Sequence, residues 1–251
     1  MNFMASMRQY TGKQLLTFIR NGRYAHAGEE EAITMMMDQF KKSPDQMILD
    51  VGCGLGGTAH FIQQNGWGQV TGLDIENNSI QDAKKHYPHM NFLTADVHQI
   101  SEIFKNTFDI ICLFNAFYSF REQNKALSAL AITAKPQANL AIFDYLDLCE
   151  SYKNPLFCDG KDAMPFIPIR LDTIESMLFN AGWKLLDTLV INEQYKIWYT
   201  NLVMKLTSKK EEAIKQFGQA IYDQASDTYH KLLNAIIKKE LGGVIIYATK
   251  L

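Results

Sequence analysis

A glycine-rich loop offers the clearest chemistry in this sequence. It reads Asp50-Val51-Gly52-Cys53-Gly54-Leu55-Gly56-Gly57 and follows a short apolar stretch. Glycines directly after a buried strand allow a tight turn and let a ligand approach the backbone closely. A carboxylate just before the turn can orient the loop backbone and a cationic amine of the ligand. We therefore predict that a small cofactor is bound here by Asp50, Gly52, Cys53, Gly54 and Gly56.

Two further carboxylates stand at the ends of the next two apolar stretches. Asp74 comes twenty residues after Gly54 and directly before Ile75. A carboxylate at that place accepts hydrogen bonds from both hydroxyls of a ribose. Asp96 ends the third stretch, where it would accept from the exocyclic amine of an adenine while Val97 packs on the ring. The spacing therefore predicts an adenosine-containing cofactor contacted by Asp74, Ile75, Asp96 and Val97.

The glycine loop alone does not decide which adenosine cofactor is bound. Gly52, Gly54 and Gly57 fit the GxGxxG pattern of dinucleotide-binding folds. Gly52, Gly54 and Gly56 fit the GxGxG pattern of enzymes that use S-adenosylmethionine (SAM). The carboxylate at Asp96 discriminates between them, because SAM enzymes habitually have it and dinucleotide folds do not require it. The combined pattern favours SAM.

Three motifs in this order, LDVGCGLGG, GLDIENNSI and TADV, resemble those of class I SAM-dependent methyltransferases. The similarity covers roughly residues 47–145 and continues more weakly to the last strand. It implies SAM as cofactor and a Rossmann-like, seven-stranded, mostly parallel sheet. It also implies that the last strand, 244–249, inserts antiparallel to its neighbours.

A closer resemblance is to the phosphoethanolamine and related small-molecule methyltransferases. It rests on QYT at 9–11, GRYAHAG at 22–28, TIESMLFNAGW and the ending LGGVIIYATK. The first two segments look like the helical N-terminal lid of that group, which folds over the cofactor. Ser119 stands where the group has a catalytic histidine, and the segment after the fifth strand has few positive residues, Lys161 and Arg170 among them. Phosphoethanolamine is therefore not predicted as the acceptor.

The candidate catalytic residues are Tyr10, Tyr24, His26 and Asn115. In a lid, either tyrosine would face the cationic sulfonium or hydrogen-bond the nucleophile. His26 is the first candidate for a base, since it lies in the lid segment expected near the cofactor. Asn115, at the end of the fourth strand, would lie in the ligand crevice and orient the reactants. No metal is expected.

Alternating strand and helix signals predict the framework that positions these residues. Repeated β-α units with short connections indicate an α/β fold with a doubly wound parallel sheet. The run 108–114 is nearly all apolar, as expected of a strand with helices on both faces. The expected strands are 46–51, 69–75, 91–95, 108–114, 139–145, 183–191 and 244–249, and the expected helices are 29–40, 58–65, 77–87, 122–134, 171–180 and one or two within 207–241.

Length and composition limit the domain plan and the partners. The 251 residues carry 25 Lys+Arg and 27 Asp+Glu, and this near-neutral balance argues against nucleic acid or an acidic membrane as main partner. No apolar run approaches the ~20 residues that span a bilayer, and the first residues show no secretory signal. The scattered cysteines suggest reduced thiols in a cytoplasmic protein. We expect one domain: a lid at 1–43, a SAM-binding core at 44–194 and C-terminal helices with the last strand at 195–251. An irregular insert at 147–170 is expected to cover the active site.

The resulting hypothesis is methyl transfer from SAM to a small-molecule acceptor at nitrogen, oxygen or activated carbon. Two alternatives stay open: a SAM-fold binding or regulatory module without catalysis, and an NAD(P)-dependent oxidoreductase. The acceptor, the number of methyl groups transferred, the general base and the oligomeric state are left open by the sequence.

Overall fold

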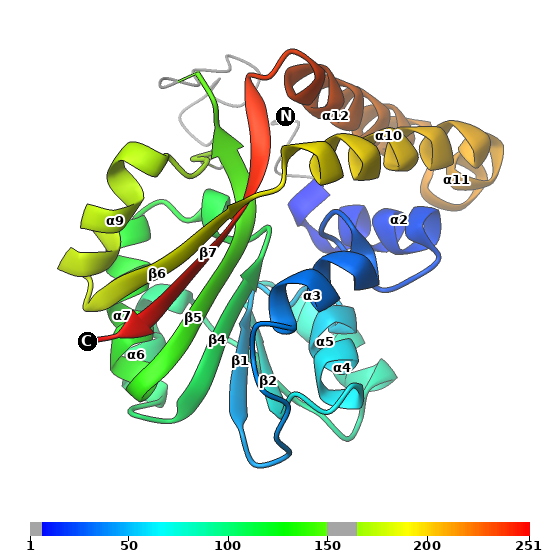
Figure 1. Cartoon of the computed structure of the whole chain (residues 1–251). Helices are drawn as coiled ribbons and strands as arrows, with labels where there is room; N and C mark the ends of the chain where they lie inside the picture. The colour runs from blue at the N-terminus through cyan, green and yellow to red at the C-terminus, as the bar shows by residue number, and fades with distance from the viewer. Residues whose placement is uncertain (1–6, 150–164) are drawn as a thin grey trace.

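The centre of the molecule is a seven-stranded sheet in the order β3-β2-β1-β4-β5-β7-β6 (Figure 1). The computed structural model describes residues 7–149 and 165–251. Strands β1 to β5 pair in parallel, and β7 runs antiparallel to both of its neighbours. The expected fold class, including the antiparallel last strand, is therefore confirmed. The strands are β1 Met47–Val51, β2 Gln69–Asp74, β3 Asn91–Thr94, β4 Phe108–Phe114, β5 Ala134–Asp147, β6 Trp183–Val190 and β7 Leu241–Lys250.

Strand β4 shows why the sheet is buried on both faces. Ile110 and Cys112 pack into one hydrophobic cluster, whereas Ile111 and Leu113 pack into the other. Successive side chains of a strand point to opposite faces, so a continuous apolar run is what two covered faces require. The interpretation of 108–114 as a doubly covered strand is correct.

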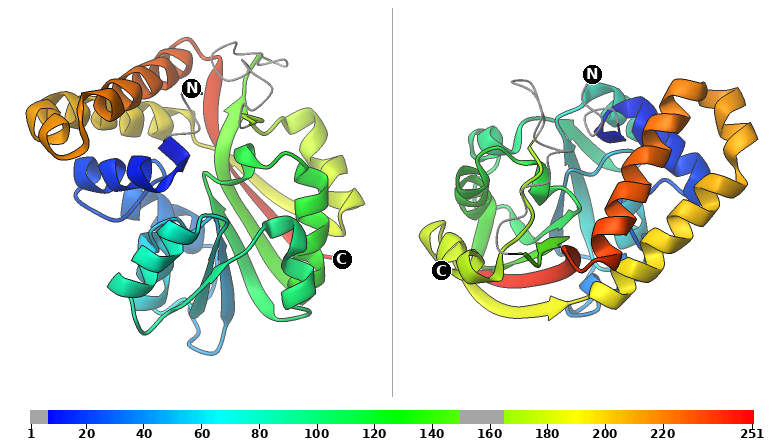
Figure 2. Two further views of the ribbon diagram at one scale, coloured as in Figure 1. Left: turned by 180° about the vertical axis from the view of Figure 1, so that it is seen from behind. Right: turned by 90° about the horizontal axis from the view of Figure 1, so that it is seen from above.

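Helices cover the two faces of the sheet in separate groups (Figures 1 and 2). One group packs over the β1–β3 half, and the other packs beside β5 and β6. The first group is α3 Glu29–Met37, α4 Gly57–Gln64 and α5 Asn77–His86, and the second is α6 Ile100–Ile103, α7 Gln123–Thr133 and α9 Leu171–Asn180. Short 3-10 turns, η1 Val97–Gln99 and η2 Phe117–Ser119, follow β3 and β4.

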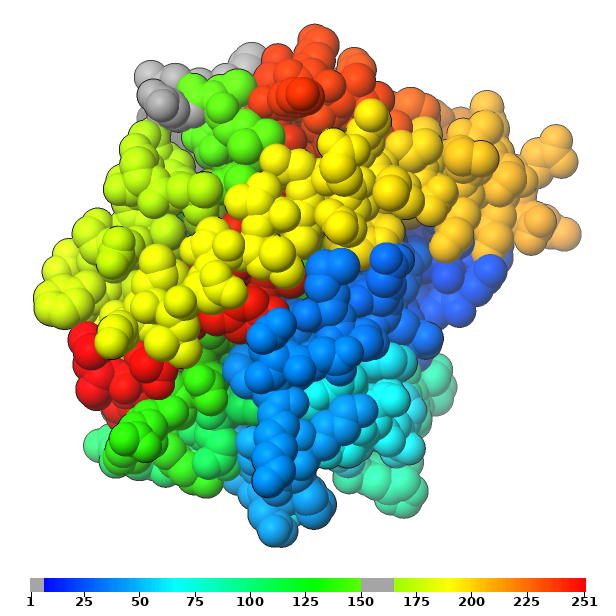
Figure 3. Space-filling model, viewed as in Figure 1, coloured from blue at the N-terminus to red at the C-terminus, as the bar shows by residue number. Residues whose placement is uncertain are grey.

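An N-terminal helix and three helices from the C-terminal part of the chain pack together above the carboxyl ends of the parallel strands (Figure 3). Helix α2 (Tyr10–Arg20) contacts all three C-terminal helices, which are α10 Asn192–Ser208, α11 Lys210–Phe217 and α12 Gln219–Ile237. Polar bonds reinforce the contact: the Trp198 indole donates to Glu31, and the Lys209 ammonium donates to the Phe18 carbonyl. Apolar packing dominates, because Leu15, Leu16 and the facing side chains of α10 and α12 belong to one cluster.

One feature of the C-terminal segment differs from the sequence expectation, and a second expectation lies mostly outside the described residues. The residues of α10 were not expected to be helical before 207, although Tyr195, Trp198 and Leu202 recur at helical spacing and are buried. Their aromatic and β-branched neighbours resemble a strand continuation, which masks the period. Most of the insert expected at 147–170 lies outside the described residues; within them, Ile169 bridges to Leu146. No helix among the described residues is long and apolar enough to cross a membrane.

Candidate active site

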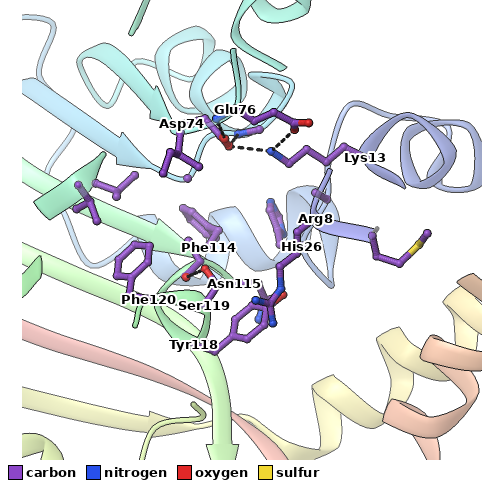
Figure 4. Close-up of a pocket in the computed structure, with 18 of the residues that line it drawn as sticks. Arg8, Lys13, His26, Asp74, Glu76, Phe114, Asn115, Tyr118, Ser119 and Phe120 are labelled. Carbon is purple, nitrogen blue, oxygen red and sulfur yellow. Dashed lines mark hydrogen bonds and ion pairs between the residues drawn. The ribbon is translucent and has the colours of Figure 1, made fainter. Parts of the chain in front are cut away.

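A cavity of about 440 Å³ lies where the parallel strands end (Figure 4). Its floor comes from residues that follow the strands, among them Gly52, Asp74, Asp96 and Asn115. Its roof comes from α2 and the residues before it, and from α10 and α12. Open α/β sheets bind ligands at this edge, so the topology and the cavity agree on the position of the site.

The glycine loop forms the floor after β1, and its glycines are sterically required. Gly52 has a φ of +78°, and a Cβ there would lie 2.6 Å from the Cβ of Ala116. A Cβ on Gly57 would lie 2.3 Å from the carbonyl oxygen of Arg23, so Gly57 admits the segment that follows α2. Gly52 and Gly54 line the cavity, whereas Cys53 and Gly56 do not. The loop therefore brings bare backbone to the cavity, as the sequence suggested.

Asp74 at the end of β2 lies at the centre of a hydrogen-bond cluster. Its Oδ2 accepts from the Gly54 amide at 2.9 Å and from the Lys13 ammonium at 3.0 Å, while its Oδ1 accepts from the Glu76 amide at 2.9 Å. Lys13 also approaches Glu76 at 3.2 Å and Ser79 at 3.2 Å. Burial alone would lower the pKa of Lys13, but the two carboxylates outweigh it and raise that pKa. Lys13, which the sequence did not single out, thus ties α2 to the expected ribose carboxylate.

The end of β3 supplies a second carboxylate to the cavity. Asp96 Oδ1 accepts from the His98 amide at 2.9 Å and from the His98 ring nitrogen Nδ1 at 2.6 Å. Burial acts to raise the pKa of Asp96, but these bonds outweigh it, so the pKa is lowered and the group stays ionised. Val97, Ile75 and Phe120 line the same region. This end therefore combines a fixed anion with apolar surface.

Residues 48–137 match a family model described as a methyltransferase domain. An O-methyltransferase of Pyrenophora dematioidea is 27% identical over 169 residues, which cover 64% of this chain and 62% of that one. Phosphoethanolamine N-methyltransferase 3 of Arabidopsis thaliana is 25% identical over 251 residues, covering 95% of this chain and 50% of that one. A solved structure of Haemonchus contortus phosphoethanolamine N-methyltransferase 2, with phosphomonomethylethanolamine and S-adenosylhomocysteine, has a TM-score of 0.86 at 18% identity, covering 100% of this chain and 60% of that one. Residues 48–137 are therefore a methyltransferase domain, and the chain is similar to SAM-dependent methyltransferases.

The family, the enzyme class and the cofactor that the three motifs predicted are thereby confirmed. The chain spans between half and two thirds of the length of these relatives. At 18% identity the structural similarity shows the fold alone, so any acceptor has to be argued from the residues of this chain.

Asp50 lies behind the glycine loop and does not line the cavity. Burial, and then the negative charge of Asp74, raise its pKa to about 7, although the Ala59 amide donates to it. Its Oδ2 is buried without a hydrogen-bond partner among the described residues. Whether Asp50 contacts the cofactor stays a prediction. Its burial and its raised pKa are properties of the fold.

The raised pKa of Asp50 predicts a pH-dependent effect of Asp50→Asn. The folded pKa is above the unfolded value, so ionisation costs the native state stability as the pH rises from about 4 to about 7, and the full cost remains above that. Asparagine escapes this cost. The stability of Asp50→Asn relative to the native protein should therefore increase from pH 4 to pH 8, by at most about 4 kcal/mol. Urea unfolding at the two pH values measures it, with the exposed Asp38→Asn as control; a pH-independent difference would contradict the prediction.

His26 lines the cavity but is fully engaged in the fold. Its Nδ1 lies 2.9 Å from the Ala27 carbonyl oxygen and therefore carries the proton, so Nε2 accepts from the Thr58 hydroxyl at 2.9 Å. Burial lowers the pKa of His26 to about 4. With both ring nitrogens bonded, the geometry supports a holding role, and the role of base stays a prediction without geometric support.

Asn115 is brought to the cavity by an unusual backbone conformation, with a φ of +47° that Asn tolerates better than most residues. Its Oδ1 accepts from the Ala27 amide at 3.3 Å, and its Nδ2 donates to the Tyr195 hydroxyl at 2.9 Å. The carboxamide therefore connects the end of β4 to the lid segment and to α10. This placement fits the predicted orienting role.

Tyr10 and Tyr24 are not among the residues that line the cavity. The Tyr10 hydroxyl lies 3.4 Å from Asp82, and the Tyr24 hydroxyl donates to Glu30 at 3.0 Å. Ser119 does line the cavity, and its hydroxyl donates to the Ala116 carbonyl at 2.6 Å. Direct catalytic roles for the two tyrosines stay predictions that the geometry does not support. Lys161 lies outside the described residues, and Arg170 pairs with Asp172 on the surface.

Four tyrosines form the far wall of the cavity. The tyrosine wall consists of Tyr118, Tyr145, Tyr199 and Tyr229. Neighbouring rings touch in that order, with centroid distances of 4.9, 6.1 and 6.4 Å, and the Tyr145 and Tyr199 hydroxyls are hydrogen-bonded. Burial is the main cause that raises the pKa of Tyr145, Tyr199 and Tyr229. These phenols are therefore hydrogen-bonding groups at neutral pH.

Metal chemistry has no candidate site in the part of the chain that the structure describes, since no group of three His, Cys, Asp or Glu there could hold an ion. Cys53, Cys112 and Cys149 are free thiols, and Cys158 lies outside the described residues.

Proposed function

We propose that this protein transfers a methyl group from SAM to a small-molecule acceptor at nitrogen, oxygen or an activated carbon. The observation that carries the proposal is a single cavity with two chemically different ends. Asp74, Asp96 and the glycine loop line one end, and the tyrosine wall lines the other. The first end suits an adenosine, and the second suits a partly apolar acceptor.

The residues at the first end fit the adenosyl part of the cofactor. Gly52 leaves a space that a Cβ would fill, next to the carboxylate of Asp74. We assign the ribose hydroxyls to Asp74 and the adenine amine to Asp96. Both hydrogen bonds from His98 go to Oδ1 of Asp96, so Oδ2 remains for the amine. Val97 and Ile75 would contact the adenine ring. Asp50, Cys53, Gly54 and Gly56 would hold the loop in shape.

SAM supplies a methyl group on a sulfonium, which a nucleophile takes by in-line displacement. The contribution of the chain is then position and exclusion of water. Asn115, fixed between Ala27 and Tyr195, orients the reactants at the middle of the cavity. His26 holds the lid segment on α4 through Thr58. Burial raises the pKa values of Tyr145, Tyr199 and Tyr229, so these three phenols are donors rather than bases at neutral pH. The proposal therefore expects an acceptor whose nucleophile loses its proton readily.

The proposal includes a single domain in which 1–43 is a lid, 44–194 the SAM-binding core and 195–251 a C-terminal cover. Extensive packing of α2 against α10, α11 and α12 supports a common roof. It also includes a cytoplasmic location, which suits the free thiols.

Calorimetry with S-adenosylhomocysteine tests the proposal, with NADH as the competing ligand. Saturation to a hundred times Kd should also stabilise the protein by about 2.7 kcal/mol. Binding of NADH in place of S-adenosylhomocysteine would overturn the proposal. Transfer of a labelled methyl group from SAM to the small-molecule fraction of a cell extract then separates an enzyme from a binding module; binding without transfer supports the module.

Lys13 should act as a latch that holds α2 over Asp74, the carboxylate assigned to the ribose of the cofactor. The Oδ2 of Asp74 already has two donors, so one ribose hydroxyl competes with the Lys13 ammonium for it. Lys13→Met should open α2 in the ligand-free protein and speed amide exchange at residues 15–20 about tenfold. Association of S-adenosylhomocysteine should also become faster. Lys84→Met, at an exposed lysine of α5, is the matched control; native exchange rates in Lys13→Met would exclude the latch.

A further inference from the structure

The tyrosine wall continues into one cation of the N-terminal segment, Arg8. Its guanidinium carbon lies 4.5 Å from the centre of the Tyr118 ring, and both residues line the cavity (Figure 4). The charge of Arg8 also acts on the Tyr229 hydroxyl at the other end of the wall, where it lowers the pKa that burial raises. Arg8 and the tyrosine wall therefore form one continuous surface, which we call the acceptor end.

No carboxylate in the described part of the chain balances the charge of Arg8. Residues 7–28 contain four Lys or Arg side chains. Three of them form ion pairs: Lys13 with Asp74 and Glu76, Arg20 with Glu29, and Arg23 with Asp82. Arg8 has no carboxylate within 4.0 Å among the described residues. The acceptor end, as defined by these described residues, thus carries one net positive charge and no acid.

The hydrogen bonds of the Arg8 guanidinium leave one edge free. Its Nη1 donates to the Pro165 carbonyl at 2.8 Å. Its Nε and Nη2 are buried, and neither has a partner among the described residues. Nε and Nη2 form the side-on edge of a guanidinium, whose two parallel N–H bonds match the two oxygens of a carboxylate. Buried donors without partners are costly, so this edge is where a ligand anion would be most stabilised.

We propose that the methyl acceptor is a small monocarboxylate with an apolar or aromatic body, bound by the side-on edge of Arg8 and packed against the tyrosine wall. The inference rests on the proposed function. One unpaired cation balances a monoanion, whereas a phosphate dianion would need a second one. Lys13 and Arg20 are already paired, and Arg121, which also lines the cavity, is engaged in an interaction of its own. A cationic amine acceptor is disfavoured by the same charge.

Four probes of one shape test this proposal: benzoate, benzamide, benzylamine and phenyl phosphate, each titrated by ligand-observed NMR into the protein saturated with S-adenosylhomocysteine. Benzoate should bind about tenfold or more tightly than benzamide, since a hydrogen bond to a charged group gains more than one to a neutral group. Equal binding of the two, tighter binding of benzylamine or phenyl phosphate, or no binding of any probe overturns the proposal. Failure of S-adenosylhomocysteine itself to bind would instead refute the proposed function.

Variants of Arg8 locate the effect. Arg8→Met should remove the preference for benzoate over benzamide. Arg8→Lys should keep only part of it, because an ammonium has the positive charge but lacks the two parallel N–H donors of a guanidinium. Lys125→Met removes an exposed cation from α7 and should leave the preference unchanged. Calorimetry with S-adenosylhomocysteine checks the fold of each variant. The proposal is wrong if Arg8→Met still prefers benzoate over benzamide. It is also wrong if Arg8→Met keeps that preference but binds S-adenosylhomocysteine more weakly, because Arg8 then does not hold the acceptor.

Discussion

Asp74→Ala is expected to weaken binding of S-adenosylhomocysteine roughly a hundredfold. Each ribose hydroxyl bonded to an ionised carboxylate contributes about 1.5–3 kcal/mol, and a factor of ten corresponds to about 1.4 kcal/mol. The substitution also releases the Gly54 amide and the Lys13 ammonium, so the glycine loop and α2 both lose an anchor. Calorimetry of the variant measures the effect.

Asp109→Ala is the matched control for this measurement. Asp109 lies at the opposite end of the sheet, where it accepts from the Met47 amide and pairs with Lys135. Its loss removes a comparable carboxylate without touching the cavity, so the affinity should stay at the native value. If Asp74→Ala binds S-adenosylhomocysteine as tightly as the native protein, the ribose assignment is wrong.

Asp144→Ala is expected to cost the fold about 3 kcal/mol or more. Asp144 is completely buried; it accepts from the Tyr145 amide at 2.7 Å and from the Tyr118 amide at 3.0 Å. Burial raises its pKa to about 7 although several hydrogen bonds act to lower it. Alanine would leave these amides buried without an acceptor, and the turn that carries Tyr118 would lose its anchor.

Urea unfolding at fixed pH measures the loss of stability in Asp144→Ala. Asp187→Ala, at an exposed position of β6, is the control and should change the free energy of unfolding by less than about 0.5 kcal/mol. A native unfolding midpoint for Asp144→Ala would show that the buried amides find other partners. Benzoate binding in a variant that still folds should weaken as well, because Tyr118 supports Arg8.

The convergence of Gly52, Asp74 and Asp96 at one end of the cavity could be predicted from the sequence, because each residue ends or closely follows a strand of the same parallel sheet. Each strand end places the next residue at the same edge of the sheet, so Gly52, Asp74 and Asp96 converge once the strands are recognised. The strand 108–114 and the helix 171–180 agree with the structure residue for residue for the same local reason.

The acceptor end could not be read in this way. Tyr145, Tyr199 and Tyr229 meet only through the packing of α10 and α12 against β5 and α2, which no local spacing encodes. The placement of Arg8 and Lys13 depends on the angle at which α2 crosses the strand ends. One signal was available: Tyr195 and Tyr199 are four residues apart, a helical spacing that would have revealed α10. The role of Asp144 could not be predicted, because nothing in the sequence of an apolar strand shows that one acid within it accepts hydrogen bonds from buried amides.

The helices that roof the cavity, α2 on one side and α10 and α12 on the other, are far apart in the sequence, and this separation affects when the roof can form during synthesis. During synthesis the loop after β1, Asp74 and Asp96 emerge early, and α12 with Tyr229 emerges near the end. A domain generally folds as a unit during synthesis. Helix α2 meanwhile has its apolar face exposed until α10 and α12 arrive to cover it. In a nascent chain of this protein, the cavity can therefore be completed only after α10 and α12, which carry Tyr199 and Tyr229, have emerged.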